Sequence, residues 1–386
     1  MKKIWYVLPI AITLFIWACS SDSDSPEPMT DDDVSITDDD VVPVTFDRSA
    51  MLTNWADNII LPAYNDFFVV FADFQSAYDT FRTARTEENL VVLRAEWLEA
   101  YKSWQRISMF EVGPAEENGL RLNINTYPTD VDLLEQYVVN DDQDFSLPSN
   151  RDVKGFPALD YLLNGLAETD AEIIAIYNTD TTGDAYVDYF KDVISDIESR
   201  VLTVLDGWNG GYRDTFVAND GASATASVDV FVNDFIFYYE KFLRAGKLGN
   251  PLGVFTGSTA PNTIEAFYSA GVANELFLEG LNATQDFFNG RHFATTGSGE
   301  SLASYLQALN SLKNGEELDV LINDQLDVAR TMVSNLDSFR SEIENNDPPA
   351  DMLLAYDEVQ RAVPLLKVDM VSAMSISIDF VDADGD

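Results

Sequence analysis

The sequence predicts an all-α protein built from long antiparallel helices. Apolar and aromatic residues recur three and four positions apart over most of the chain, which is the spacing of one helix face. No long stretch alternates apolar and polar residues with a period of two, except a short segment at 374–380. Because strands would show that alternation throughout, helical bundles are the architecture that the pattern favours.

The first 19 residues are predicted to be a secretory signal that ends in a lipidation site. Two lysines precede an apolar run from Ile4 to Ala18, which is too short to span a membrane as a helix. Residues 16–19 resemble a bacterial lipobox, whose cysteine is lipidated after cleavage. Cys19 is the only cysteine in the 386 residues, so an exported chain would have no partner for a disulfide bond. We therefore predict a membrane anchor at Cys19.

Residues 20–45 are predicted to form a disordered acidic tether. They carry nine acidic residues, no Lys or Arg and few large apolar side chains, so they cannot bury enough surface to fold. The whole chain is also acidic, with a formal net charge of −43 at pH 7. Such a charge repels nucleic acid and favours cations or basic ligands, so we expect no nucleic-acid partner.

Helices are predicted in chain order from the spacing of their apolar residues. The first long helix carries an aromatic stripe at alternating intervals of four and three: Phe67, Phe71, Phe74, Tyr78 and Phe81. The next carries Trp97, Tyr101 and Trp104. Further helices are expected at about 157–167, 184–206, 226–245, 262–289, 316–345 and 349–374. Two of them have recognisable starts, since Asn262 and Glu265 form a capping-box pattern and Asp347 precedes Pro348.

A Gly-rich polar stretch near the middle of the chain predicts a boundary. It divides the body into an N-terminal helical bundle at 46–210, an interdomain loop at 211–227 and a C-terminal helical bundle at 228–386. Each half holds enough amphipathic helices for a bundle of about four. The aromatic stripes are expected to fill the seams of these bundles rather than to hold a cofactor.

Several kinds of catalytic site are excluded by the residue types present. With one histidine, His292, and one cysteine, the chain cannot build a zinc site from His and Cys ligands. It has no Gly-x-Ser-x-Gly motif for a nucleophilic serine, no Walker A loop and no Gly-x-Gly-x-x-Gly loop. Asp, Glu and Tyr oxygens remain, and these hard ligands suit calcium, magnesium, manganese or ferric iron.

An ordered set of short motifs resembles the imelysin-like family. The motifs are those at Glu96–Trp104, Glu111–Ala115, Asn125–Asp130, Gly155–Leu163, Lys247–Gly253 and Ile264–Ser269. The resemblance implies an exported, often lipid-anchored, all-helical protein of two bundle-like halves with a site between them. The family was named for an insulin-cleaving outer-membrane metallopeptidase, and relatives are linked to bacterial iron uptake.

The family's signature, Gly-x-His-x-x-Glu, is degenerate in this sequence. It reads Gly155-Phe156-Pro157-Ala158-Leu159-Asp160. Pro157 stands at the histidine position and has no side-chain donor or acceptor, whereas Asp160 keeps a carboxylate at the glutamate position. Zinc is therefore not expected, and a zinc-dependent peptidase activity loses its main support. If a metal binds, we expect iron or another hard cation at Asp160.

The resemblance gives a set of candidate ligand-binding residues: Asp160, Pro157, Tyr127, Asp130, Glu111 and Lys247. Each also has a structural interpretation. Asp160 follows a proline that suits a first helical turn and would lie near the positive end of the helix dipole. Tyr127 and Asp130 lie in a turn that Pro128 would set, and Glu111 could be a charge at a helix end. Lys247 could neutralise a buried carboxylate, bind an anionic group or extend into water.

These observations favour a non-enzymatic, lipid-anchored protein of the cell envelope. Its expected place is the outer membrane, facing the periplasm or exposed at the surface. It would bind a small ligand or a hard metal ion, with a role in iron or haem acquisition implied by the resemblance. Two alternatives remain open: a divergent metallopeptidase-like hydrolase with a carboxylate-only site, and a surface module whose acidic face binds a basic protein.

Overall fold

The computed structural model describes residues 46–179, 181–269 and 271–379, all of which belong to one compact unit. The predicted signal peptide with Cys19 and the predicted tether at 20–45 lie outside the described residues and stay predictions. Helices make up most of the described chain. The regular strands in the described ranges are two residues long each, β1 (Leu312–Lys313) and β2 (Glu316–Glu317), and pair antiparallel. The all-α prediction is therefore confirmed.

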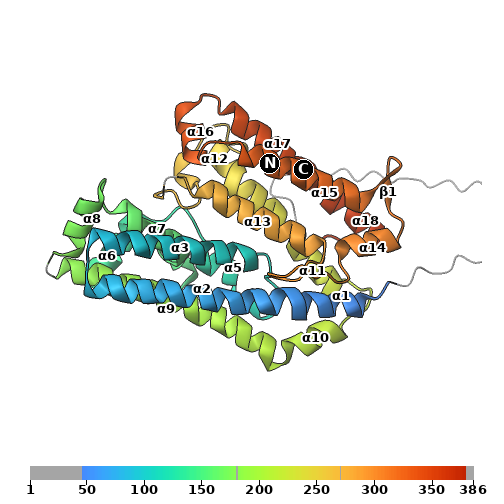
Figure 1. Ribbon diagram of the computed structural model, residues 1–386, viewed down its shortest axis with the longest axis horizontal. Helices are drawn as coiled ribbons and strands as arrows, with labels where there is room; N and C mark the ends of the chain where they lie inside the picture. The colour runs from blue at the N-terminus through green and yellow to red at the C-terminus, as the bar shows by residue number, and fades with distance from the viewer. Residues whose placement is uncertain (1–45, 180, 270, 380–386) are drawn as a thin grey trace, which may run out of the picture. The chain divides into compact units, whose positions relative to one another are not determined.

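The first half of this unit is organised around α2 (Leu61–Thr83), α3 (Glu87–Ile107) and α9 (Thr182–Gly207) (Figure 1). Helix α2 packs against both of the others. The predicted aromatic stripe lies on the buried face of α2, where Tyr78 stacks on Phe190 of α9 with ring centroids 5.0 Å apart. Aromatic side chains thus fill the seam between these helices, as the spacing predicts.

Shorter helices precede, connect and cover these three. They are α1 (Arg48–Asn54), η1 (Trp55–Ile60), α4 (Pro114–Asn118), α5 (Leu120–Ile124), α6 (Val131–Asn140), η2 (Pro148–Val153), α7 (Gly155–Asp160), η3 (Tyr161–Gly165), α8 (Asp170–Tyr177), η4 (Trp208–Tyr212) and α10 (Arg213–Ala218). Of these, η2 is a 3-10 helix, whereas η1, η3 and η4 are π-helical turns. One such π-helical turn, η3, directly follows Asp160, and π-helical turns are frequent at functional sites.

The second half is organised around the π-helix η5 (Tyr238–Gly249) and helices α13 (Ala273–Phe288), α15 (Leu318–Ser334) and α17 (Ala350–Pro364). Each of these four elements packs against two of the others, and α13 also packs against α3 of the first half (Figure 1). The remaining elements of this half are α11 (Ser227–Phe237), α12 (Asn250–Leu252), η6 (Pro261–Thr263), α14 (Leu302–Ala308), α16 (Phe339–Asn345), η7 (Leu365–Met370) and α18 (Val371–Met374).

The predicted loop at 211–227 begins as a helix, because η4 and α10 continue directly from α9. Trp208 packs against Tyr212 and Phe216, with ring centroids 4.9 and 5.3 Å away. These aromatic contacts, four and eight residues apart, pack together the helical segments on either side of a kink at Gly211, whose φ of 124° is not helical. The division of the body into two bundles stays a prediction.

The predicted helix at 262–289 is wrong in its first part, since α13 begins only at Ala273. The chain before it is a long loop that contains one 3-10 turn, η6. Gly253 turns the chain into this loop with a φ of 70°, and a Cβ there would lie 2.0 Å from the carbonyl oxygen of Ser258. The predicted capping box with Glu265 therefore does not form.

Two other boundaries differ from the sequence pattern. The predicted helix at 316–345 is interrupted where Ser338 caps α16, its hydroxyl accepting a hydrogen bond from the amide of Ser341 at 3.2 Å. The alternating segment at 374–380 forms no strand over the residues that are described, and Ile376 is instead buried in the helical core. Alternation over so few residues is outweighed by packing against helices.

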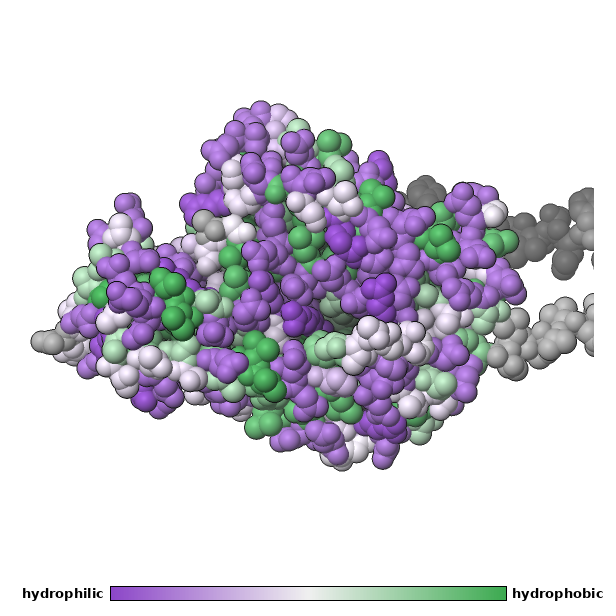
Figure 2. Space-filling model, in the orientation of Figure 1, coloured by the Kyte–Doolittle hydropathy of each residue, from purple (hydrophilic) through white to green (hydrophobic). Residues whose placement is uncertain are grey.

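The surface is mostly hydrophilic on the face shown in Figure 2, with hydrophobic side chains in small separated patches. Such scattered exposure is normal for a folded domain. Over the described ranges, none of the helices has the length and apolar character that crossing a membrane requires.

Candidate functional site

The degenerate signature forms α7, and glycine is required at its first position. Gly155 has a φ of 72°, in the left-handed region that favours glycine. A Cβ on Gly155 would lie 2.1 Å from the carbonyl oxygen of Ile124, at the end of α5. This close approach of two backbone segments fixes where α7 begins and, one and a half turns later, where Asp160 lies.

We expect Gly155→Ala to lower the free energy of unfolding by about 1–3 kcal/mol, because alanine is strained at this φ and meets the backbone of Ile124. Urea denaturation measures the change. The matched control is Gly210→Ala in η4, where no atom lies within 4 Å of the new Cβ. The control should change stability by less than about 0.5 kcal/mol. Equal effects in the two variants would contradict the proposed packing role.

Asp160 is a buried carboxylate that accepts hydrogen bonds from a distant loop. Its side chain is 1% exposed. One oxygen accepts from the backbone amide of Tyr268 at 2.7 Å, and the other accepts from the amide nitrogen of Asn164 at 3.1 Å. Asn164 also donates to the hydroxyl of Ser269 at 2.9 Å. The carboxylate therefore joins the signature to the loop that precedes α13.

Burial raises the pKa of Asp160 to about 7, although hydrogen bonds from Tyr268, Asn164 and Ser269 act in the opposite direction. Removal of a carboxylate from water disfavours its charged form more than these donors favour it. Asp160 therefore exchanges its proton near neutral pH. Carboxyl groups with this property are concentrated at functional sites.

Asp160 lines a pocket of about 150 Å³ together with two other residues that the sequence singled out, Pro157 and Tyr127. The loop before α13 forms the opposite wall. The full lining is Tyr127, Pro128, Thr129, Pro157, Asp160, Asn262, Ile264, Ala266, Phe267 and Tyr268. The structure thus brings three of the six candidate residues to one cavity, which we call the Asp160 pocket.

Lys247 lies in η5 and does not line this pocket, because its side chain is committed to a buried ion pair. Its ammonium group pairs with Glu265 and donates to the side-chain oxygen of Gln105 at 2.9 Å. Lys247 and Glu265 are 4% and 1% exposed. Of the three roles considered for Lys247, neutralising a buried carboxylate is the one observed.

Glu265 is the centre of a polar cluster behind the Asp160 pocket. Besides Lys247, it accepts hydrogen bonds from Gln105 at 3.0 Å and from Asn125 at 2.7 Å. Tyr101 donates to Asn125 at 2.5 Å. Glu265 stands between two residues that line the pocket, so one short segment forms both the pocket wall and the cluster. We call these five residues the Glu265 cluster.

Tyr127 and Asp130 have different surroundings in the structure, although they belong to one sequence motif. Tyr127 is half-buried and burial raises its pKa well above the ordinary value, so it stays a neutral wall residue. Its hydroxyl lies 3.3 Å from the position that a Cβ on Gly246 would take. Asp130 is exposed and caps α6, accepting from the amide of Leu133 at 3.0 Å. Asp130 therefore has a structural role.

Glu111 belongs to a different buried cluster, with Arg121 and Asp234. It accepts from the backbone amide of Arg121 at 2.7 Å, and the guanidinium of Arg121 pairs with Asp234 at 3.0 Å. Burial raises the pKa of Glu111 to about 7, against the opposing effect of Arg121. This cluster lines a separate pocket of about 300 Å³. The structure does not bring Glu111 to the Asp160 pocket.

The described side chains do not fit a zinc ion of the family's kind. Among them, no three His, Cys, Asp or Glu residues converge as a metal-binding group. Pro157 occupies the position of the family's histidine ligand, and His292 does not line the Asp160 pocket. A hard cation at Asp160 would therefore find one carboxylate there and would take its other oxygens from water or from its own chelator.

Sequence reasoning did not assign to the site the residues that face Asp160. They are Asn164 of η3 and, in the loop before α13, Asn262, Ala266, Phe267, Tyr268 and Ser269. A helix was expected here because apolar residues recur at helical spacing. The contrary signal was present in the chain, since Gly253, Gly257, Pro261 and Gly271 punctuate this stretch. Such a density of breakers predicts a loop, and loops carry functional residues more often than helices do.

Known proteins are similar to this chain in sequence or in structure. The chain is 24% identical over 236 residues to iron-regulated protein A of Synechococcus elongatus, and the match covers 59% of this chain and 62% of that relative. Two solved structures share the fold with TM-scores of 0.66 and 17% identity. They are an iron-regulated protein A precursor from Parabacteroides distasonis, covering 84% of this chain and 95% of its own, and an imelysin-like protein from Psychrobacter arcticum, covering 86% and 97%.

A sequence model of the imelysin family matches residues 60–363, from the start of α2 to the end of α17. The matched region contains the signature on α7, the loop that faces it and the Glu265 cluster. This span is most of the chain and most of the described structure. The chain therefore belongs to the imelysin family.

Proposed function

We propose that this protein is a non-enzymatic, lipid-anchored binding protein of the cell envelope, which captures a small ligand at the Asp160 pocket. The observation that carries the proposal is Asp160 itself. It is a buried carboxylate at the position of the family's signature glutamate, and it lines a pocket. Pro157, at the histidine position, leaves that carboxylate without the partner that a zinc-dependent reaction would use.

The chemistry of the pocket favours a hard cation or a cationic group. Asp160 offers a negative charge once its proton leaves, and its hydrogen-bond partners are the neutral amide groups of Tyr268 and Asn164. The other walls supply neutral oxygens from Tyr127, Thr129 and Asn262. Hard cations prefer such oxygen ligands. The pocket is small, so a cation with its chelator would place only part of the complex inside.

Iron carried by an organic chelator is the ligand that we favour. The relative from Synechococcus elongatus is named an iron-regulated protein, which supports a role in iron uptake. The predicted lipid anchor at Cys19 and the acidic tether would hold the pocket at the outer membrane, where iron is acquired. The large negative charge of the chain raises the local concentration of cations.

Calorimetric titration of residues 44–386, after dialysis against a chelator, tests this proposal. Ferric citrate, ferrous iron, zinc and calcium are each added to the wild type and to Asp160→Asn. We expect saturable one-to-one binding of an iron species and at least a tenfold loss of affinity in the variant, because the site loses its one carboxylate. Asp130→Asn is the matched control. It removes an exposed carboxylate whose capping role asparagine can fill, so affinity should not change.

Equal affinity of the wild type and Asp160→Asn for the ligand would contradict the proposal that the ligand binds in the Asp160 pocket. Absence of binding for every ion would mean that the site takes an organic molecule without metal. Cleavage of insulin or casein that a chelator inhibits would instead support the divergent hydrolase. These three outcomes are measured independently on the same preparation.

A further inference from the structure

The cavity of about 300 Å³ beside Glu111 shares no lining residue with the Asp160 pocket. Helices α4, α5 and α11 and the π-helix η5 contribute to its walls. Its volume reaches the range of small-molecule sites, whereas the Asp160 pocket lies below that range. We call it the Glu111 pocket.

The Glu111 pocket carries more negative than positive groups. Its lining contains one basic side chain, Arg121, and four carboxylates: Glu111, Glu116, Asp234 and Asp379. The guanidinium of Arg121 donates to both oxygens of Asp234, at 3.1 and 3.0 Å. The same guanidinium lies 3.6 Å from one oxygen of Glu111. One arginine therefore faces two partly buried carboxylates, and a negative charge is left over.

Glu111 supplies the carboxylate that is not fully neutralised. One of its oxygens accepts from the backbone amide of Arg121 at 2.7 Å, whereas the other accepts no hydrogen bond from any residue in the described ranges. The side chain is 15% exposed and lines the pocket, so a ligand can reach it. Burial raises the pKa of Glu111 to about 7, because the opposing effect of Arg121 is smaller. A cation in the pocket would favour the ionised carboxylate.

The pocket also has an apolar wall that is open to a ligand. Leu122 is 39% exposed, and Val230, Phe237 and Phe242 are half-buried. The rings of Phe237 and Phe242 meet edge to face, with centroids 5.7 Å apart. Covering these side chains removes apolar surface from water, which stabilises a complex with a ligand that has an apolar part.

A bare metal ion does not match this lining. Hard cations such as calcium take about six to eight oxygen ligands. In the part of the chain that the structure describes, no three Asp, Glu, His or Cys side chains converge closely enough to hold such an ion. An organic cation matches both features of the pocket, because its charge pairs with a carboxylate while its apolar part covers the wall.

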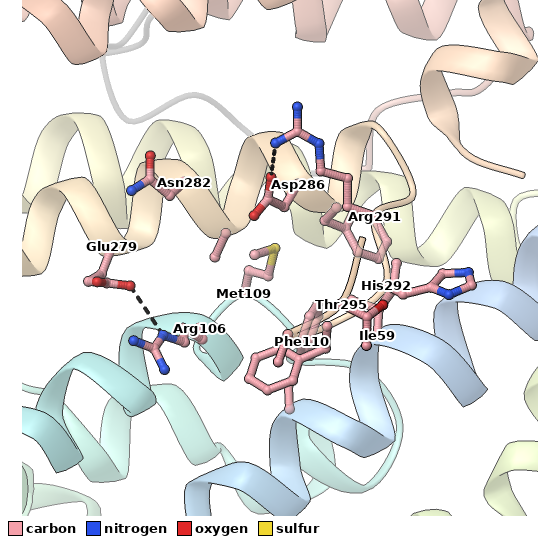
Figure 3. Close-up of a pocket in the computed structure, with 15 residues that line it drawn as sticks. Ile59, Arg106, Met109, Phe110, Glu279, Asn282, Asp286, Arg291, His292 and Thr295 are labelled. Atoms are coloured by element: carbon pink, nitrogen blue, oxygen red, sulfur yellow. Dashed lines mark hydrogen bonds and ion pairs between the residues drawn. The ribbon is translucent and has the colours of Figure 1, made fainter. Parts of the chain in front are cut away.

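The cavity between α2, α3 and α13 shows the opposite balance of charge (Figure 3). Its volume is similar, at about 340 Å³. Each of its two arginines is matched by a carboxylate, since Arg106 donates to Glu279 at 3.1 Å and Arg291 donates to Asp286 at 2.7 Å. Figure 3 shows both pairs at the rim. The excess of negative charge is therefore a property of the Glu111 pocket and not of every cavity in this acidic protein.

We propose that the Glu111 pocket binds a small organic amine, whose ammonium group pairs with Glu111 and whose apolar chain or ring lies against Leu122 and Phe242. The exposed carboxylates of Glu116 and Asp379 attract the cation to the pocket. The protein then carries two separate binding sites. This proposal does not depend on what the Asp160 pocket binds.

Calorimetric titration of residues 44–386 with phenethylamine at pH 8 tests the proposal, because at this pH Glu111 is ionised and the amine is still charged. We expect saturable binding of one amine per chain. Glu111→Gln should weaken binding at least tenfold, since glutamine keeps an acceptor for the amide of Arg121 but loses the charge. Asp160→Asn should leave the affinity unchanged. A loss of affinity in Asp160→Asn and not in Glu111→Gln would overturn the proposal.

Two exposed neighbours give a matched pair of variants that leaves the buried carboxylates and Arg121 in place. Glu116 and Glu117 both lie in the first turn of α4, but Glu116 lines the pocket and Glu117 does not. Glu116→Lys and Glu117→Lys change the net charge equally. Glu116→Lys should bind phenethylamine at least threefold more weakly than Glu117→Lys, because its new charge lies at the pocket. Equal affinities of these two variants would contradict binding at this site.

Two further ligands separate the roles of charge and apolar surface. The first is 2-phenylethanol, which keeps the ring but has a hydroxyl in place of the ammonium group. The second is methylamine, which keeps the charge without the ring. Each should bind at least tenfold more weakly than phenethylamine. Absence of saturable phenethylamine binding, or equal binding of either analogue, would overturn the proposal.

Discussion

Replacing Glu265 by glutamine should lower the free energy of unfolding by about 3–5 kcal/mol, one of the two largest effects that we expect. The carboxylate is 1% exposed, and it accepts from three groups: Lys247, Gln105 and Asn125. Glutamine offers a single acceptor oxygen and brings two donor hydrogens of its own. Its amide nitrogen must therefore face either the ammonium group of Lys247 or the amide donors of Gln105 and Asn125, and in both orientations Lys247 is left without a counter-ion.

Urea denaturation measures this change, and two variants control it. Lys247→Met combined with Glu265→Gln removes the stranded charge, so the double variant should be more stable than Glu265→Gln alone. Asp286→Asn breaks the pair with Arg291 that is exposed to solvent, and it should change stability by less than about 1 kcal/mol. A Glu265→Gln effect no larger than that of Asp286→Asn would show that the buried pair is not required for the fold.

The pH dependence of Glu265→Gln provides a second readout. Burial lowers the pKa of Lys247, and Glu265 opposes that effect. Without Glu265, the pKa of Lys247 in the folded protein should lie still further below its value in the unfolded chain. The free energy of unfolding of the variant, relative to that of the wild type, should therefore rise with pH, because at high pH the unfolded chain loses this proton as well. A structural defect unrelated to the lysine charge would show no such rise.

The parts of the fold that local spacing determines could be predicted from the sequence. The aromatic stripe predicts both the helix α2 and its buried face, because five rings at helical spacing lie on one side of a helix and that side must be buried. The sequence also predicts a helix at the signature segment, because Pro157 is compatible with a first turn, and α7 confirms it. In both cases the determining residues lie within a few turns of one another.

The partners in the two polar clusters could not be predicted, because they come from distant parts of the chain. Glu265 meets Gln105 across 160 positions, and Asp160 meets Tyr268 across 108. A sequence with 66 acidic residues gives no indication of which carboxylates will be buried. Capping geometry favoured a local role for Glu265, but the tertiary contact with Lys247 determines its position. Asp160 was identified only through the family resemblance.

The stability of the wild type relative to Asp160→Asn should fall as pH rises from 5 to 8, by roughly 2–3 kcal/mol. The pKa of Asp160 is raised from 3.8 to about 7 by burial, so the folded state keeps a proton that the unfolded chain releases. The stabilisation from this proton is complete below pH 3.8, decreases as pH rises, and is lost above about pH 7. Asparagine has no proton to lose, so the variant lacks this dependence.

Urea denaturation of both proteins at pH 5, 6, 7 and 8 measures the difference. Leu159→Val is the matched control, because Leu159 is the buried neighbour of Asp160 on α7 and does not titrate. Its effect on stability should be the same at each pH. A difference between wild type and Asp160→Asn that does not change with pH would mean that the carboxylate ionises alike in the folded and unfolded chain.

The same proton sets the pH dependence that we expect for ligand capture. A cation that binds Asp160 must displace the proton, so its affinity should fall about tenfold for each pH unit below 7 and level off above 7. Calorimetric titration of the iron species at pH 5 and pH 8 measures this change: affinity at the Asp160 pocket should be at least tenfold lower at pH 5. Equal affinity at the two pH values would contradict the assignment of the cation to Asp160.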